Sequence, residues 1–352
     1  MKKIAYLTGT RAEFGLMSSI LKAVDKDKNL ELMLLVTGMH LMDEFGYTIT
    51  QVDREFEKTE VVEAVFKKDD RESMARFVGK CTAKTVEVLI KHRPDVVMVL
   101  GDRGEQLAMA TAAAYLNIPI VHLSGGDLTT TVDDKARRAI SMLADWHLPN
   151  NKVSKKRLLS MGVKEQKIKK VGASGLDQVK RFNKAKKQDL IVVLQHPDEN
   201  EEKAAEQMTI TLKAVIDFNL PVRIIYPNAD AGGRTMIKII KDFKNKYPKL
   251  IKTYKNLEQI KYLKLLSKAQ VLVGNSSSGL VEAPSLKLPA VNIGPRQQGR
   301  TKAKNVIDVP YNLEAIKKAV KRAMTMDLTN LKNPYEDGQT TEKIIKFLKN
   351  LL

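Results

Sequence analysis

The chain has 352 residues, which is more than one hydrophobic core usually supports, so its length favours two domains. Hydrophobic residues make up 43% of it and charged residues 29%, which excludes a disordered protein, and no apolar run is long enough to span a membrane. The formal net charge of +19 comes from lysines spread along the chain with few aromatic residues between them. This pattern favours solvated surfaces over a nucleic-acid site.

The first residues and the cysteine content indicate the compartment. Residues 1–9 carry two lysines and a short apolar run, but this run is too short for a signal peptide and lacks a small-residue cleavage site. We interpret it as a first buried strand. Cys81 is the only cysteine, so an internal disulfide is excluded and there is no cysteine cluster for a metal. We expect a cytoplasmic protein with no membrane partner.

The first half of the chain predicts βαβ units on a parallel sheet, because short apolar runs alternate with longer amphipathic segments. The expected strands are at residues 4–7, 31–36, 96–100 and 118–123. The expected helices are at residues 16–24, 105–115 and 133–144. The last of these helices opens with two acidic residues, which suit the positive end of a helix dipole.

The polar, charged segment at residues 181–188 is interpreted as a linker between domains at residues 1–180 and 189–339. After it the same alternation restarts. The expected strands are at residues 190–194, 222–226, 271–273 and 290–293, with a helix at 257–269. Two open α/β sheets predict a cleft between them, and ligands of such sheets lie beyond the carboxyl ends of the strands. The polar motifs of the sequence fall at these ends.

Two motifs at strand ends of the first domain carry charged residues. Residues 8–15 form a small turn in which Arg11 can fork onto a phosphate or a carboxylate, with an ordinary strand-to-helix turn as the alternative. Asp102, Arg103 and Glu105 crowd three charges after the strand at 96–100, which suits the tuning of pKa values for proton transfer. A helix cap at Asp102 has the same form and is compatible with that role.

A third motif of the first domain lies at residues 122–127. His122 ends a strand, where it is either a structural histidine with its hydrogen bonds satisfied or a functional one. The helix that follows carries Asp133 and Arg137 at a spacing of four, so these two side chains are expected on one helix face, where they can pair.

In the second domain, His196 follows the first strand and residues 228–232 follow the next. Residues 274–282 read as a strand that leads into a small serine-rich loop and a helix start, where backbone N–H groups, hydroxyls and the helix dipole can hold a phosphate. Glu282 is placed to take both hydroxyls of a ribose, and a surface helix glutamate is the alternative. Residues 294–300 add guanidinium groups.

Together these motifs resemble those of the hydrolysing UDP-N-acetylglucosamine 2-epimerases. The resemblance covers essentially the whole chain and is most specific in Gly-Asn-Ser-Ser-Ser-Gly with its following glutamate, at 274–282, and in Gly-x-Arg-Gln-x-Gly-Arg, at 294–300. It implies a glycosyltransferase B-like α/β fold of two Rossmann-like parallel-sheet domains facing a cleft. It also implies that the helix at 340–352 returns to complete the first domain.

The resemblance further implies that UDP binds mainly to the second domain, with Ser276 and Ser277 on the diphosphate and Glu282 on the ribose. Arg11 reaches the phosphates from the first domain, and His196 lies near the departing diphosphate oxygen. The other implied contacts with the nucleotide or the sugar are Glu13, His40, Ser124, Asn228, Asp230, Asn275, Ser278, Arg296 and Arg300. The implied catalytic residues are Asp102, Arg103, His122, Asp127, Asp133, Arg137 and His196.

The implied chemistry is an anti elimination of UDP across C1–C2 of UDP-N-acetylglucosamine, or of a related UDP-2-acetamido sugar. Addition of water then gives a ManNAc-type sugar in which carbon 2 is inverted. A positioned base must take the C2 proton, and Asp102, Asp127 and Asp133 are the candidates. No cofactor is expected, and no metal either, because the acidic residues of the motifs show no ligand spacing. The expected partner is the nucleotide sugar, without nucleic acid, and the chain is expected to form a dimer or tetramer.

Two departures from the commoner family pattern bear on the substrate. Ser124 precedes the two glycines where the family usually has Glu or His, and Arg137-Arg138 stands where Arg-His often occurs. Serine cannot act as a general base without an activating partner, so these departures point to another proton acceptor or to a different sugar, such as a 2,4-diacetamido-trideoxyhexose. The alternatives to a hydrolysing epimerase are a non-hydrolysing epimerase, a glycosyltransferase of the same fold and a non-catalytic nucleotide-sugar sensor.

Overall fold

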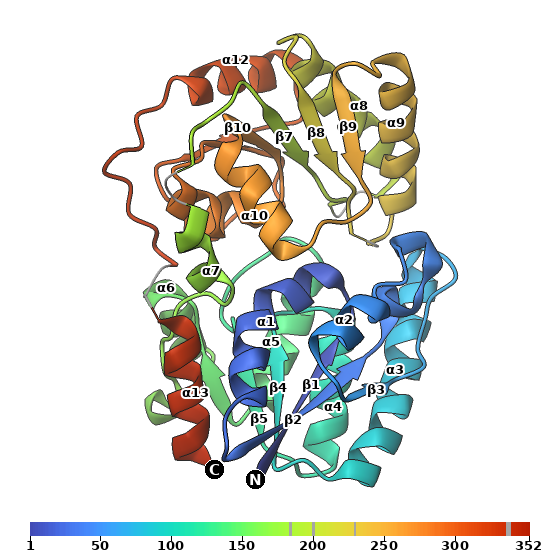
Figure 1. Ribbon diagram of the computed structural model, residues 1–352, viewed down its shortest axis with the longest axis vertical. Helices are drawn as coiled ribbons and strands as arrows, with labels where there is room; N and C mark the ends of the chain where they lie inside the picture. The colour runs from blue at the N-terminus through green and yellow to red at the C-terminus, as the bar shows by residue number, and fades with distance from the viewer. Residues whose placement is uncertain (183–184, 199–200, 229, 336–338) are drawn as a thin grey trace. The chain divides into compact units, whose positions relative to one another are not determined.

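The computed structural model describes residues 1–182, 185–198, 201–228, 230–335 and 339–352 (Figure 1). The chain forms two compact units. Unit 1 comprises Met1–Asp127, Val132–Asp177 and Tyr335–Leu352, and unit 2 comprises Leu128–Thr131 and Gln178–Pro334. The linker expected at 181–188 stays a prediction, and its residues 183 and 184 lie outside the described ranges, as does residue 229 of the motif at 228–232.

Unit 1 contains a six-stranded parallel sheet in the order β3-β2-β1-β4-β5-β6. Its strands are β1 (Lys2–Thr8), β2 (Leu30–Val36), β3 (Thr59–Val61), β4 (Val96–Leu100), β5 (Ile120–Leu123) and β6 (Trp146–Leu148). Its helices are α1 (Arg11–Asp25), α2 (Ile49–Glu55), α3 (Arg71–His92), α4 (Gly104–Tyr115), α5 (Val132–Leu143), α6 (Lys152–Ser160) and α13 (Thr340–Leu351), with α7 (Leu176–Val179) at the boundary. Short 3-10 helices lie at Gly38–Leu41, Asp43–Phe45 and Glu165–Lys167.

The central strands of unit 1 are mostly apolar because helices cover both faces of the sheet, whereas the edge strand β3 is Thr-Glu-Val and is not buried. Every residue of β4 is buried, and Tyr6, at the centre of β1, is fully buried in the core with Phe14 and Met98. The helix expected at 16–24 begins earlier, at Arg11, because the Thr10 side chain accepts a hydrogen bond from the Glu13 N–H at 3.3 Å and caps α1.

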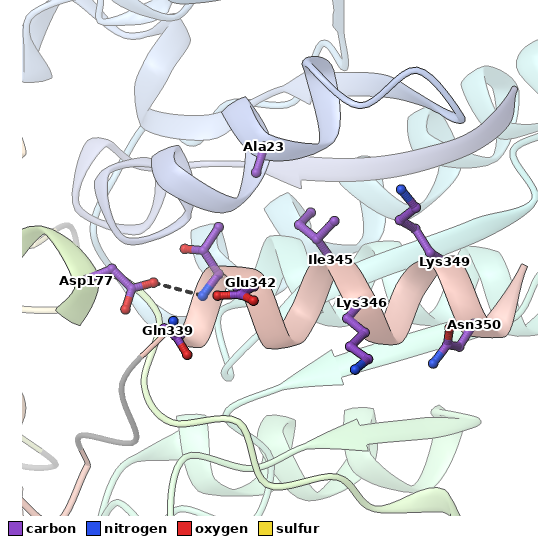
Figure 2. Close-up of a pocket in the computed structure, with 9 residues that line it drawn as sticks. Ala23, Asp177, Gln339, Glu342, Ile345, Lys346, Lys349 and Asn350 are labelled. Atoms are coloured by element: carbon purple, nitrogen blue, oxygen red, sulfur yellow. Dashed lines mark hydrogen bonds between the residues drawn. The ribbon is translucent and has the colours of Figure 1, made fainter.

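Helix α13, from the end of the chain, packs in unit 1 beside α1 (Figure 1). Its Ile344 and Leu348 side chains are fully buried in the core of that unit. Asp177 accepts hydrogen bonds from the Thr340 N–H (3.2 Å) and the Thr341 N–H (2.8 Å), which satisfies two otherwise unpaired donors at the helix start. A cavity of about 680 Å³ lies against α13 (Figure 2), and its described lining includes none of the predicted site residues.

Unit 2 contains a second six-stranded parallel sheet in the order β12-β11-β10-β7-β8-β9. Its strands are β7 (Ile191–Leu194), β8 (Val222–Ile225), β9 (Ile251–Tyr254), β10 (Val271–Gly274), β11 (Ala290–Ile293) and β12 (Val306–Val309). Its helices are α8 (Ala204–Ile216), α9 (Gly233–Lys246), α10 (Gln259–Lys268), α11 (Ser278–Val281) and α12 (Leu313–Met324), with 3-10 helices at Lys180–Phe182, Glu201–Lys203 and Ala283–Leu286. Two parallel sheets flanked by helices confirm the predicted fold class. Every helix in the described ranges is too short or too polar to cross a membrane.

Candidate functional site

The turn after β1 holds a buried carboxyl group, that of Glu13. This carboxyl accepts hydrogen bonds from the Tyr6 hydroxyl, from the Gly9 N–H at 3.3 Å and from Gln106 Nε2 at 3.1 Å. Burial, together with the nearby charge of Glu105, raises the pKa of Glu13 to about 8, so the protonated form is favoured at neutral pH. Glu13 therefore organises the turn that carries Arg11.

The turn after β4 holds Asp102 against a buried arginine. Arg137 donates from Nη2 to the Asp102 carboxylate and from Nη1 to the Ser124 carbonyl oxygen, at 2.9 Å. The Arg137 side chain is only 6% exposed, whereas that of Asp102 is 17% exposed. The predicted Asp102 helix cap is wrong, because α4 begins at Gly104 with Arg103 as N-cap and no side-chain cap bond. Asp102 thus keeps a partly exposed carboxylate, held by a cation.

Arg103 and Glu105 form a second ion pair at the same turn, with Arg103 Nε 2.8 Å from Glu105 Oε1. The Glu105 side chain is only 3% exposed, while that of Arg103 is 25% exposed. Gln106, which the sequence analysis did not single out, bridges the ends of β1 and β4: it donates to the Leu7 carbonyl oxygen at 2.6 Å and accepts from the Leu100 N–H at 3.0 Å. The sequence signal that could have identified Gln106 is a polar residue at the start of an otherwise apolar helix.

Two predicted histidines of unit 1 are fully buried with both ring nitrogens engaged. His122 Nε2 donates to the Gly101 carbonyl oxygen at 2.8 Å, and its Nδ1 accepts from the Ser141 hydroxyl at 3.1 Å. Burial, with the charges of His147 and Arg137, lowers the pKa of His122 to about 3. His40 lies between the hydroxyls of Thr8 and Thr48. Burial and Arg11 lower the pKa of His40 to about 4. Both rings are neutral at pH 7, which favours a role in holding the adjacent turns.

Asp127 is also anchored within unit 1. It accepts hydrogen bonds from the Ser154 hydroxyl and from Asn150 Nδ2, the latter at 3.2 Å, and it is 4% exposed. The Ser124 hydroxyl donates to Asn150 Oδ1 at 2.9 Å, so Asn150 joins the two predicted residues. Asn150 was missed because the strand before it, β6, has only three residues. Asp133 lies in the first turn of α5 and is partly buried.

In unit 2, the loops after β7 and β8 meet at His196. His196 Nδ1 accepts the Asn228 N–H at 3.1 Å, and Asn228 Nδ2 donates to Asp230 at 2.7 Å. Arg296, which is 8% exposed, also donates to Asp230, at 3.2 Å. These contacts join three sequence motifs that lie far apart in the chain. They hold the His196 imidazole ring in one orientation.

The serine-rich loop follows β10. Gly274 adopts φ +138°, and a Cβ there would lie 2.1 Å from the Leu194 carbonyl oxygen, so only glycine lets the two backbones approach this closely. Ser276 and Ser277 are partly exposed, whereas Ser278 is buried and its hydroxyl accepts from Tyr262 at 2.5 Å. The helix that opens here, α11, has only four residues.

Glu282 directly follows α11, and it is 7% exposed, so it is not the surface helix glutamate considered above. Burial raises the pKa of Glu282, while the Ser278 hydroxyl and the charge of Arg300 oppose that shift. Arg300 Nη1 donates to Gln297 Oε1 at 3.1 Å. Among the described residues of both units, no three His, Cys, Asp or Glu side chains are grouped so as to hold a metal ion.

Comparison with known proteins places this geometry in a family. The sequence model of the family described as UDP-N-acetylglucosamine 2-epimerase matches residues 22–349. The chain is 35% identical to the UDP-N,N'-diacetylbacillosamine 2-epimerase (hydrolysing) of Legionella pneumophila, covering 100% of this chain and 96% of that protein. It is 33% identical to the GDP/UDP-N,N'-diacetylbacillosamine 2-epimerase (hydrolysing) of Campylobacter jejuni, over 88% of this chain and 85% of that one.

A solved structure shows the same fold. The UDP-GlcNAc 2-epimerase of Methanocaldococcus jannaschii, crystallised with UDP-GlcNAc and UDP, superposes with a TM-score of 0.80 at 22% identity and covers 99% of each chain. The fold, with two parallel six-stranded sheets in this chain, is of the glycosyltransferase B type. With a family match that spans nearly its full length, the chain belongs to the UDP-N-acetylglucosamine 2-epimerase family.

Proposed function

We propose that this enzyme is a hydrolysing 2-epimerase that converts a UDP-2-acetamido sugar and water into UDP and the free sugar with carbon 2 inverted. The observation that carries the proposal is the partly exposed Asp102 carboxylate, held by the buried Arg137 guanidinium at the carboxyl end of β4. The two relatives that are 35% and 33% identical, both named as hydrolysing epimerases, support it.

Asp102 is the proposed base for the C2 proton. The Arg137 guanidinium orients the Asp102 carboxylate, and the Ser124 carbonyl oxygen holds the guanidinium in place, so the proposed base has a fixed position. Asp127 is the weaker candidate, because Ser154 and Asn150 occupy its oxygens and it is nearly inaccessible. Asp133, in the first turn of α5, is the alternative base, and Arg103 is proposed to face the sugar.

UDP is proposed to bind to unit 2. The partly exposed Ser276 and Ser277 would donate to the diphosphate, with Arg296 and Arg300 supplying positive charge nearby. Buried Glu282 would accept from the ribose hydroxyls, and His196 would donate to the departing diphosphate oxygen. Arg11, on the β1 turn, is the proposed phosphate contact of unit 1.

The reaction proceeds in two steps. In the first, the base takes the proton from C2, the C1–O bond breaks with its electron pair leaving on UDP, and a C1–C2 double bond forms. In the second, water adds its hydroxyl to C1, and a proton returns to C2 from the opposite face. The sum is UDP and a 2-acetamido sugar of the manno type.

We propose UDP-N,N'-diacetylbacillosamine as the preferred substrate over UDP-N-acetylglucosamine. The names of the two relatives just mentioned support this choice. Ser124 also supports it, since this smaller side chain lies at the end of β5, next to the Arg137–Asp102 pair, where the family usually has Glu or His. The proposed assembly is a homodimer or tetramer in the cytoplasm, which light scattering and fractionation would test.

The decisive experiment is turnover of both UDP sugars in heavy water, with the products followed by NMR. We expect UDP and a free manno-type sugar with deuterium at C2, because the returning proton adds from the face opposite the base and therefore comes from water or from a group that exchanges with water. UDP-linked manno product would indicate a non-hydrolysing epimerase. Turnover only with an added acceptor would indicate a glycosyltransferase, and binding without turnover would indicate a sensor. Free sugar that keeps its C2 hydrogen and gluco configuration would overturn epimerisation.

A further inference from the structure

A chain of hydrogen-bonded polar groups, some buried and some half-buried, crosses the carboxyl ends of three strands in unit 2 and ends on His196. The Asn275 side chain, which is fully buried, accepts the His196 N–H at 2.7 Å and donates to the His196 carbonyl oxygen at 2.8 Å. One amide therefore holds both backbone polar groups of His196. The Asn275 carbonyl oxygen is itself held by Gln297 Nε2 at 2.8 Å.

The same amide continues the chain away from His196. Asn275 Nδ2 has a second hydrogen, which it donates to the Tyr311 hydroxyl at 3.4 Å, and the Tyr311 hydroxyl donates to Asp198 at 2.8 Å. Gln207, on α8, donates to both Asp198 oxygens at 3.2 Å. Burial and the Asp198 charge raise the pKa of Tyr311, so its hydroxyl remains a donor. The direction of every hydrogen bond is thus set.

The Tyr311 ring is fixed by packing as well. Gly294, after β11, adopts φ +76°, and a Cβ there would lie 2.4 Å from a ring carbon of Tyr311. The glycine of the motif at 294–300 is therefore needed for the tyrosine to reach the chain.

The His196 ring is oriented by a backbone donor. Its Nδ1 accepts the Asn228 N–H, so the proton of the neutral imidazole is on Nε2.

We propose that Asn275 and Tyr311 are positioning residues, which act on the reaction through His196 and do not touch the nucleotide. Asn275 was expected above to contact the substrate, but the oxygen and the nitrogen of its side chain form hydrogen bonds with His196 and Tyr311. Tyr311 is linked to His196 through the Asn275 side chain and through Asp198, which lies two residues further along the same loop. The inference rests on the proposed role of His196 at the departing diphosphate oxygen.

Tyr311→Phe tests the chain with the smallest change in shape. We expect kcat to fall about tenfold, because the hydrogen bonds of the Tyr311 hydroxyl to Asp198 and Asn275 are lost and His196 is held less firmly. The dissociation constant for UDP should stay within about twofold of the parent value, because the nucleotide contacts are elsewhere. Tyr247→Phe is the matched control: this tyrosine packs on Phe243 in the same unit, and the variant should keep the parent kcat.

A double-mutant cycle separates positioning through His196 from a general effect on folding. His196→Ala should lower kcat strongly, and adding Tyr311→Phe to it should lower kcat no further. Effects that multiply, or a Tyr311→Phe variant with parent kcat, would overturn the positioning role while leaving the proposed function intact. A His196→Ala variant with parent kcat would overturn both the role of His196 and this inference.

Discussion

The two units repeat one strand order with different polar groups at the strand ends. When the two sheets are aligned on the first strand of each unit along the chain, β1 corresponds to β7 and β4 corresponds to β10. The turn after β4 carries Asp102 and the turn after β10 carries Ser276. In unit 1 buried ion pairs and carboxyl groups line these ends, whereas in unit 2 amides and hydroxyls are prominent there. The scaffold is shared and the chemistry is not.

From this difference we infer that the two units have different roles in the reaction. A carboxyl group next to a fixed guanidinium suits the transfer of a proton from carbon, while hydroxyl and N–H donors suit the binding and release of a phosphate anion. Substitutions in unit 1 should therefore change kcat, and substitutions in the serine-rich loop of unit 2 should change the affinity for UDP.

The largest effect is expected for Asp102→Asn. The amide cannot accept the C2 proton and it loses the ion pair with Arg137, so kcat should fall about a thousandfold or more, measured as UDP release. The dissociation constant for UDP, measured by calorimetry, should change by less than about twofold.

Asp134→Asn is the control for that substitution. It also breaks an Asp–Arg pair, between Asp134 and Arg138 one helix turn apart, but here the arginine is 58% exposed, whereas Arg137 is 6% exposed. Such pairs contribute little, so kcat should be unchanged. Equal losses in the two variants would contradict the assignment of Asp102 as the base, and loss of UDP binding in Asp102→Asn would break the division between the units.

The second prediction concerns the serine-rich loop. The double substitution Ser276→Ala, Ser277→Ala removes two hydroxyl donors, and we expect the affinity for UDP to fall between about tenfold and a hundredfold. Calorimetry with UDP measures this directly. At saturating substrate, kcat should fall much less than in Asp102→Asn. Unchanged UDP affinity would remove the diphosphate from this loop.

The third prediction uses the buried histidines of unit 1. Burial lowers the pKa values of His40 and His147 to about 4 and of His122 to about 3, so between pH 6.5 and these values the unfolded state binds more protons. Each histidine then reduces the free energy of unfolding by about 2 kcal/mol when the pH falls from 7 to 5. Glu13, with its pKa raised to about 8, opposes this loss, because its folded form already holds a proton.

Hydrogen exchange at pH 7 and pH 5, corrected for intrinsic rates, tests that balance. Peptides from the β1 and β4 strands should lose protection at pH 5, and those from β7 and β10 should lose less, because His196 is the only histidine described in unit 2. In Glu13→Gln the loss in unit 1 should be larger, since the opposing contribution is gone. Equal losses in the two units would contradict the assignment to the buried histidines.

Sequence patterns located the elements whose burial produces a regular pattern of apolar residues along the chain. The strand expected at 96–100 is β4 to the residue, because a central parallel strand is apolar throughout. The outer strands β3 and β6 have three residues each and gave no signal. Helix α3, the longest of the described elements, was also missed: it buries only a narrow row, Phe77, Cys81, Thr85 and Leu89.

The sequence predicted that the candidate site lies at the strand ends. It did not predict which side chains contact each other there. The spacing of four suggested that Arg137 pairs with Asp133, yet the structure directs Arg137 to Asp102, 35 residues away. Helix periodicity brings out only local pairs. Likewise Tyr311 and Asp198 lie 113 residues apart, and neither stands out in the sequence. Contacts of this kind arise only once the sheet has aligned its strands.

The smallest effect is expected for metal removal, which tests whether the two units suffice for the chemistry. In unit 2, Arg296 and Arg300 are the proposed partners of the diphosphate, and in unit 1 Arg137 holds the proposed base, so we expect arginine side chains to supply the positive charge that a metal ion supplies in other enzymes. Activity in EDTA should therefore stay within about twofold of the untreated value. Loss of activity in EDTA with recovery on adding magnesium would show that these arginines do not supply the required charge.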